Sequence, residues 1–166
     1  MKTKLKTFWK LGPLAVIAVS VGLAACSEGP ATAAGSSEAD AGFPTMVAYR
    51  SPTCGCCELW VEHMRAAGFR VDVEVTNDME RVKRQAGVPP GGGSCHTAHV
   101  GDYFVEGHVP AADIKRLLAE MPDARGLTVP GMPKGSPGME QGGIREPYDV
   151  LLVGNDGSTS IFASHR

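Results

Sequence analysis

Three of the chain's five cysteines occur within four positions, at Cys54, Cys56 and Cys57. Cys54 and Cys57 form a C-x-x-C pair, and Cys56 lies inside it. At the start of a helix such a pair has a lowered thiol pKa, because the free N–H groups and the helix dipole stabilise the thiolate. The thiolate both attacks disulfides and binds soft metals, so the spacing fits redox exchange and metal binding equally.

Cys56 favours metal binding over disulfide exchange. An exchange site needs one attacking and one resolving sulfur, and a third thiol beside them offers a competing, strained pairing. A soft metal ion gains a ligand from the same thiol, because thiolates select Cu(I), zinc and iron–sulfur centres. Zinc more typically uses two separated cysteine pairs. We therefore interpret the cysteine turn as a metal-binding motif, with disulfide exchange as the alternative.

The residues around the turn predict a strand, a helix and a second strand. Residues 45–51 alternate in polarity and predict a strand that leads into the cysteines. Apolar residues then recur at helical spacing up to a glycine C-cap at Gly68: Cys57, Trp60, Val61 and Met64. Residues 69–77 predict the second strand, and residues 78–86 a short helix. A right-handed crossover makes the two strands parallel, with the cysteines at the carboxyl end of the first.

The rest of the chain predicts two short strands, a helix and a hairpin. Residues 95–109 indicate strands joined by a turn at Gly101, and residues 110–121 an amphipathic helix that starts at a proline. The last 19 residues predict two strands around Asp156 and Gly157. The order is βαβ followed by ββα with a C-terminal β-hairpin, an α/β class that resembles the thioredoxin fold.

The resemblance to the thioredoxin fold assigns a position to Cys95. In such folds the loop before the third strand packs over the C-x-x-C turn, which implies that Cys95 and His96 face the other cysteines. Four sulfurs and an imidazole would then converge. The alternative is a structural disulfide between Cys95 and one of the other three cysteines, as an oxidising compartment permits.

The other histidines are weaker candidates for metal binding. His96 and His99 are three positions apart on a predicted strand, so their side chains point to opposite faces and only His96 is proposed as a ligand. His63 lies about 10 Å along the helix from Cys56, given a rise of about 1.5 Å per residue. We expect His63, His108 and His165 at the surface.

Two methionines lie in a loop rich in glycine and proline. Met132 and Met139 occur within residues 129–143, where no helical or strand pattern explains them. Thioethers in such a loop either pack as a lid or bind Cu(I). Both methionines are therefore possible metal ligands, and packing is the alternative.

The first 42 residues predict secretion and a lipid anchor. A lysine-rich start and an apolar run predict a signal peptide over residues 1–25, and "LAAC" resembles the bacterial lipobox, whose cysteine, here Cys26, is lipidated. Ser27 favours the outer membrane over the inner. Residues 26–42 have the composition of a flexible tether, and residues 43–166 form the predicted domain. An ordinary signal peptide is the alternative.

Charge and location narrow the choice of partner. The net charge is −2 and there is no basic patch, which argues against nucleic acid. The signal peptide and the lipid anchor predict a periplasmic location. There, copper is the soft metal that a cell most needs to manage. Chemistry and location together therefore favour copper as the bound metal.

Four motifs in order support this interpretation: "SPTCGCC", "SCHTA", "YFVEGHVPAADIKRLL" and "GLTVPGMPKGSPGME". Together they resemble the CopG-like copper-resistance family, long known as a domain of unknown function. The resemblance implies a thioredoxin-like periplasmic protein that binds copper and works with other periplasmic copper-handling proteins. It assigns metal binding to Cys54, Cys56, Cys57, Cys95 and His96.

Three functions follow as hypotheses. The first is a copper-binding protein whose thiolates hold Cu(I), with copper redox conversion or transfer as a further possibility. The second is a thiol–disulfide oxidoreductase in which Cys54 attacks and Cys57 resolves. The third is a structural or adaptor lipoprotein that uses its cysteines only for disulfides.

Overall fold

The computed structural model describes residues 42–140 and 142–166. The predicted signal peptide, Cys26 and the tether up to residue 41 lie outside the described residues. Among the residues described, no helix is both long and apolar enough to cross a bilayer.

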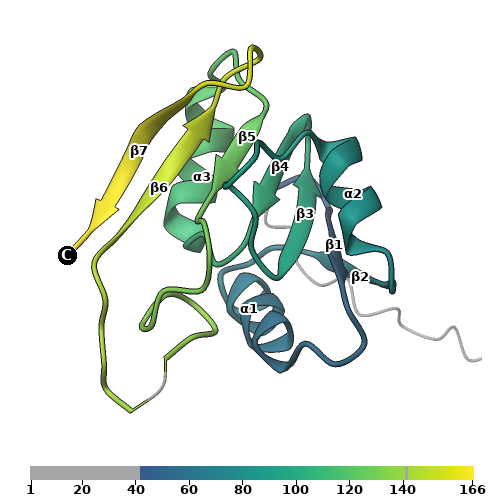
Figure 1. Ribbon diagram of the computed structural model, residues 1–166, viewed down its shortest axis with the longest axis vertical. Coiled ribbons are helices and arrows are strands. Elements are labelled where there is room, and N and C mark those ends of the chain that lie inside the picture. Colours follow the sequence, from purple (N-terminus) through teal and green to yellow (C-terminus); the bar gives the residue numbers. More distant parts are fainter. Residues whose placement is uncertain (1–41, 141) are drawn as a thin grey trace, which may run out of the picture. The chain divides into compact units, whose positions relative to one another are not determined.

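A seven-stranded sheet forms the centre of the described domain, with strand order β2-β1-β3-β4-β5-β6-β7 (Figure 1). The strands are β1 (Met46–Arg50), β2 (Val71–Val75), β3 (His96–Val100), β4 (Tyr103–Glu106), β5 (Gly126–Thr128), β6 (Tyr148–Val153) and β7 (Thr159–His165). β1 and β2 are parallel, β3 runs antiparallel to both β1 and β4, and β4 and β5 are parallel. The parallel β1–β2 pair confirms the predicted βαβ unit.

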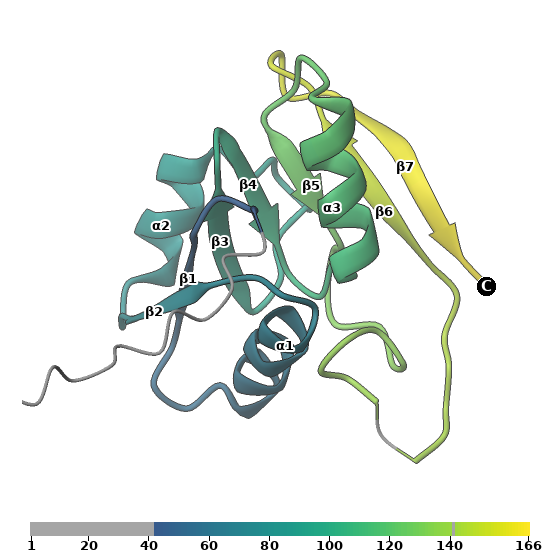
Figure 2. The same cartoon turned by 180° about the vertical axis from the view of Figure 1, so that it is seen from behind.

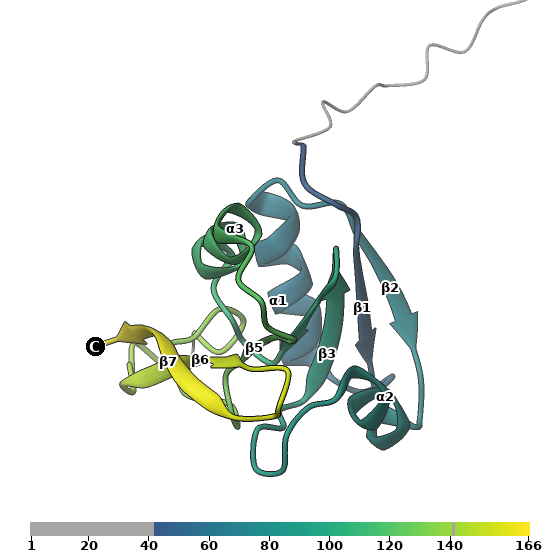
Figure 3. The ribbon, with the colours of Figure 1, turned by 90° about the horizontal axis from the view of Figure 1, so that it is seen from above.

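Three helices cover the two faces of the sheet: α1 (Gly55–Ala66), α2 (Met79–Ala86) and α3 (Ala111–Glu120). Seen from above, α1 and α3 lie on one face and α2 on the other (Figure 3), and the view from behind brings α1 and α3 to the front (Figure 2). The larger hydrophobic cluster joins Trp60 of α1 and Leu117 of α3 to the sheet, whereas a smaller cluster joins Ala86 of α2 to Phe104 and Val153.

The predicted elements are confirmed and one strand is added. All four residues of the predicted apolar face of α1 are buried, and Asp78 caps α2 by accepting a hydrogen bond from the Arg81 N–H. The strand that the sequence did not predict is β5, which is only three residues long. It pairs with β4 on one side and β6 on the other, and so connects the C-terminal hairpin to the sheet.

Candidate metal centre

The cysteine turn lies where β1 passes into α1. Cys54 is the N-cap residue of α1, and its extended backbone places the turn above the carboxyl end of β1. Cys54 and Cys57 form a disulfide, with Cα atoms 5.4 Å apart, while Cys56 and Cys95 are free thiols. The disulfide alternative considered for Cys95 is therefore not the pairing in this structure.

The structure brings all four cysteines of the domain together. The Sγ atom of Cys56 lies 3.6 Å from that of Cys54 and 3.8 Å from that of Cys95. The Sγ atoms of Cys57 and Cys95 are 3.5 Å apart. All four sulfurs lie within 4.8 Å of one another, so a single ion or a small cluster can contact every one of them once the disulfide is reduced.

Two imidazoles extend this cluster on the side of Cys95. The Cys95 sulfur lies 3.3 Å from Nδ1 of His96 and 3.0 Å from Nε2 of His108. Both rings are buried, and their centroids are 5.0 Å apart in an edge-to-face arrangement. The three residues form a second group of potential ligands that shares Cys95 with the four sulfurs.

The prediction that His108 lies at the surface is wrong, because its side chain has no solvent exposure. Gly107, at φ 74°, turns the chain after β4 and directs the imidazole inward. Nδ1 of His108 donates a hydrogen bond to the Pro137 carbonyl oxygen at 2.8 Å. Since Nδ1 therefore carries the proton, Nε2 presents its lone pair to Cys95. No local pattern in the sequence indicates this burial, because Pro137 lies in a distant loop.

His96 has a ring nitrogen without a protein partner. Its Nδ1 atom faces Cys95, and its ring packs against Trp60 with centroids 4.3 Å apart. Nε2 is buried and has no hydrogen-bond partner among the described residues. The two nitrogens of an imidazole point in different directions, so Nδ1, which faces the sulfurs, is the ligand candidate of this ring, and Nε2 stays a buried polar atom that no described residue satisfies.

Burial sets the protonation of these groups. Burial, followed by the charge of Cys56, raises the pKa of the Cys95 thiol to about 12. Burial also lowers the pKa of His96 well below its ordinary value and lowers that of His108. The imidazoles are thus neutral and able to act as ligands at pH 7, whereas Cys95 must lose a proton to a metal ion.

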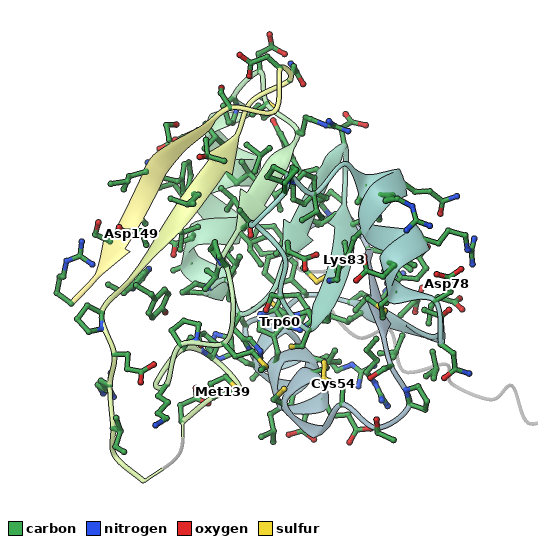
Figure 4. All side chains as sticks on the ribbon, in the orientation of Figure 1. Cys54, Trp60, Asp78, Lys83, Met139 and Asp149 are labelled. Carbon is green, nitrogen blue, oxygen red and sulfur yellow. A yellow bond between two sulfur atoms is a disulfide. The ribbon has the colours of Figure 1, made fainter. Side chains whose placement is uncertain are left out.

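The two loop methionines lie in different environments. Met139 is half-buried, whereas the Met132 side chain is exposed. Gly138 packs directly on the start of α1, since a Cβ atom there would lie 2.8 Å from the Cys56 carbonyl oxygen. Figure 4 shows Met139 on this loop, with Cys54 at the start of the helix. Of the two methionines, Met139 is therefore next to a residue that contacts the cysteine turn.

The remaining histidines lie outside the cluster. His63 is exposed on α1, as predicted, and His99 is half-buried on β3. His165 is only partly exposed, because its Nε2 atom lies 2.8 Å from a carboxylate oxygen of Asp113 on α3. This contact joins the end of β7 to α3 and does not involve the cysteine cluster.

Four sulfurs meet at the start of α1, and two neutral imidazoles from β3 and from the turn after β4 lie beside them, which is a donor set that can hold a soft metal ion. The donor set is rich in sulfur, and soft metals prefer such ligands.

Comparisons with known proteins identify the family of this chain. A family model described as "Protein of unknown function, DUF411" matches residues 92–139. Two solved structures of copper resistance protein CopG, forms 2 and 1, are each 46% identical to this chain, with TM-scores of 0.71 and 0.70. They cover 74% of this chain, which in turn covers 99% and 98% of theirs. A search of curated proteins found no match. The chain belongs to the CopG copper-resistance family.

Proposed function

We propose that this protein binds Cu(I) and contributes to copper resistance. The observation that carries the proposal is the meeting of four cysteine sulfurs within 4.8 Å, in a chain 46% identical to proteins named for copper resistance. The ligands are the thiolates of Cys54, Cys56, Cys57 and Cys95. Thiolates select Cu(I) among the copper ions, which supports this oxidation state.

His96 and His108 complete the ligand set on the Cys95 side. Both imidazoles lie within 3.3 Å of the Cys95 sulfur, His96 through Nδ1 and His108 through Nε2, and these are the two nitrogens that would bind the ion. Met139 is an additional candidate through its thioether, and exposed Met132 is a weaker one. Met139→Leu should weaken Cu(I) binding more than Met132→Leu does, and comparing the two variants shows which thioether binds the ion.

Copper occupancy is coupled to thiol oxidation at the C-x-x-C pair. When Cys54 and Cys57 are thiolates they hold Cu(I), and when they form the disulfide they hold none. Forming the disulfide from two thiols releases two electrons and two protons. Two Cu(II) ions accept these electrons and become two Cu(I) ions, so the pair supports copper redox conversion as well as binding. The cycle closes when Cu(I) passes to other periplasmic copper-handling proteins and a two-electron reductant, such as a dithiol protein, restores the two thiols with two protons.

We also propose that the protein works in the periplasm from a lipid anchor. The basic start, the apolar run and the "LAAC" tetrad support this location. Replacing Cys26 with serine should move the protein from the membrane fraction to the soluble fraction. Retention of that variant in the outer-membrane fraction would contradict the anchor.

The test of copper binding is an anaerobic titration of the reduced chain with Cu(I) against a competing chelator. The chain carries Cys26→Ser, so that the four domain cysteines are the only thiols. We expect tight binding that protects all four thiols from alkylation. Adding Cu(II) instead of Cu(I) should yield one disulfide for every two Cu(I) ions formed. Weak binding that leaves the thiols reactive would contradict the proposal.

The second candidate is a thiol–disulfide oxidoreductase, favoured by the Cys54–Cys57 disulfide in the structure. Cys54 is partly exposed and Cys57 is 1% exposed, so an external thiol can reach only Cys54. Cys54 would then attack and Cys57 resolve. Rapid reduction of a model protein disulfide by the copper-free chain would support this function.

A further inference from the structure

A buried ion pair lies directly behind the metal centre. Glu106, the last residue of β4, has no solvent exposure and precedes His108 by two positions. Its carboxylate forms an ion pair with the ammonium group of Lys83 on α2, whose side chain is only 13% exposed. Figure 4 shows Lys83 on the α2 side of β3. Burying two charges is costly unless they are paired and well hydrogen-bonded.

The carboxylate holds the chain on both sides of Cys95 and His96. One oxygen, Oε1, accepts a hydrogen bond from the backbone N–H of Ser94 at 2.6 Å. The other, Oε2, accepts one from the Thr97 hydroxyl at 2.6 Å. Since Ser94 directly precedes Cys95 and Thr97 directly follows His96, one side chain fixes both ends of this dipeptide.

Two further contacts hold the segment that leads to His108 against the segment that Glu106 binds. The N–H of Gly107 donates to the His96 carbonyl oxygen at 3.0 Å. A Cβ atom at Gly107 would lie 2.5 Å from the Cβ atom of Ser94, so the two segments touch without spare room. The position of His108 relative to Cys95 therefore depends on the segments that Glu106 binds together.

We infer that Glu106, paired with Lys83, is a positioning residue that holds Cys95 and His96 in place for metal binding. This inference rests on the proposed copper function. A carboxylate makes stronger hydrogen bonds to N–H and O–H donors than a neutral acceptor does. Groups that orient metal ligands typically change metal affinity by about 10- to 100-fold when they are replaced.

Two double variants separate positioning from stability. Replacing one partner alone would leave an unpaired buried charge, which is strongly destabilising. Lys83→Met with Glu106→Met removes both charges and the acceptor for Ser94. Lys83→Met with Glu106→Gln removes the same charges but keeps an amide oxygen that can accept the Ser94 N–H. Both are made in the full chain carrying Cys26→Ser.

The first readout is Cu(I) affinity by chelator competition. The methionine double variant should bind Cu(I) about 10- to 100-fold more weakly than the parent chain, and the glutamine double variant should stay close to the parent. Urea midpoints of both variants show that each is folded. Equal affinities in two folded variants would overturn the inference.

The second readout needs no copper. Cys56→Ser is added to the chains that already carry Cys26→Ser. When Cys54 and Cys57 form their disulfide, Cys95 is then the remaining free thiol, and its rate of alkylation by iodoacetamide measures its accessibility. Alkylation should be faster in the methionine double variant than in the glutamine one. If the parent chain fails to bind Cu(I) but this difference appears, the copper function fails and the positioning role stands. Equal alkylation rates would contradict the positioning role itself.

Discussion

Nε2 of His108 lies 3.0 Å from the sulfur of Cys95, although the two residues are 13 positions apart in the sequence. The ring is fixed in this orientation by the hydrogen bond from its Nδ1 atom to the Pro137 carbonyl oxygen, at 2.8 Å. A neutral imidazole nitrogen so close to a thiol is available to the same metal ion. His108 is therefore the ligand candidate that the structure adds to the predicted set.

The first prediction concerns this imidazole. Replacing His108 with glutamine should lower Cu(I) affinity by at least about tenfold, because the change removes a candidate ligand that is itself held by a hydrogen bond. Chelator competition under anaerobic conditions measures the change. His63→Gln, an exposed histidine on α1, is the control and should have no effect. Unchanged affinity in His108→Gln would remove His108 from the ligand set.

The second prediction separates metal binding from disulfide exchange. Cys56→Ser removes one of the four sulfurs but leaves the Cys54–Cys57 pair intact. We expect Cu(I) affinity to fall by at least about tenfold, because serine is a poor ligand for a soft ion. The reduction potential of the disulfide, measured against a dithiothreitol couple, should change little.

A different result for Cys56→Ser would favour the oxidoreductase. If the variant and the parent chain bind Cu(I) with equal affinity, Cys56 is not a ligand. The third thiol then no longer favours metal binding over disulfide exchange. Cys56→Ala is a useful companion variant, since it also removes the hydroxyl group.

The third prediction is that acid destabilises the metal-free protein. The pKa values of His96 and His108 are lowered by burial, so the unfolded chain binds protons that the folded chain does not. The stability that the two neutral imidazoles contribute is fully present above the ordinary histidine pKa of about 6.5, and it is lost as pH falls below that value. The loss approaches about 1.4 kcal/mol per pH unit for each histidine that stays neutral in the fold.

Urea unfolding at pH 7.5 and pH 5 measures this dependence. His108→Gln should have a smaller loss between the two pH values, because one of the two buried imidazoles is gone. His63→Gln should keep the loss of the parent chain. An unfolding free energy that does not fall toward pH 5 would show that the buried imidazoles are not kept neutral by the fold.

The fourth prediction compares two glycines of the loop that follows β5. Gly131 and Gly138 both have positive φ angles, of 71° and 83°. A Cβ atom at Gly131 meets no atom within 4 Å, whereas one at Gly138 lies 2.8 Å from both the Cys56 oxygen and the Trp60 nitrogen. Gly131→Ala should cost about 1–2 kcal/mol from backbone strain alone.

Gly138→Ala should lower the free energy of unfolding by about 1–3 kcal/mol more than Gly131→Ala does, because the loop must also move away from α1. Chemical denaturation of both variants gives the comparison. Copper affinity should fall only in Gly138→Ala, because Met139 and Pro137 move with this part of the loop. Equal destabilisation of the two variants would mean that the contact with α1 contributes nothing.

Much of the fold could be predicted because local patterns determine it. The spacing of Cys57, Trp60, Val61 and Met64 describes the buried face of α1, and all four are buried. The turn at Asp156 and Gly157 predicts the C-terminal hairpin for an equally local reason. β5 was missed because three residues are too few to show alternation, and its pairing partners are strands that lie far away in the sequence.

The candidate site was only partly predictable. The meeting of Cys95 and His96 with the cysteine turn was expected from the resemblance to the thioredoxin fold, and the structure brings them together. The burial of His108 depends on Pro137, in a loop without a recognisable pattern, and that of Glu106 depends on Lys83, on a predicted helix whose place beside Glu106 no local pattern indicates. A polar residue is buried only when a distant partner satisfies it, and a single sequence does not identify that partner.

The sulfurs and the segment beside them come from separate parts of the chain. The thiols belong to residues 54–57 and 95. The described residues between β5 and β6, 129–140 and 142–147, contact the site at His108 and at the start of α1. Changes in the length or composition of this one loop can alter which molecules reach the sulfurs, while the residues that set the sulfur geometry stay the same.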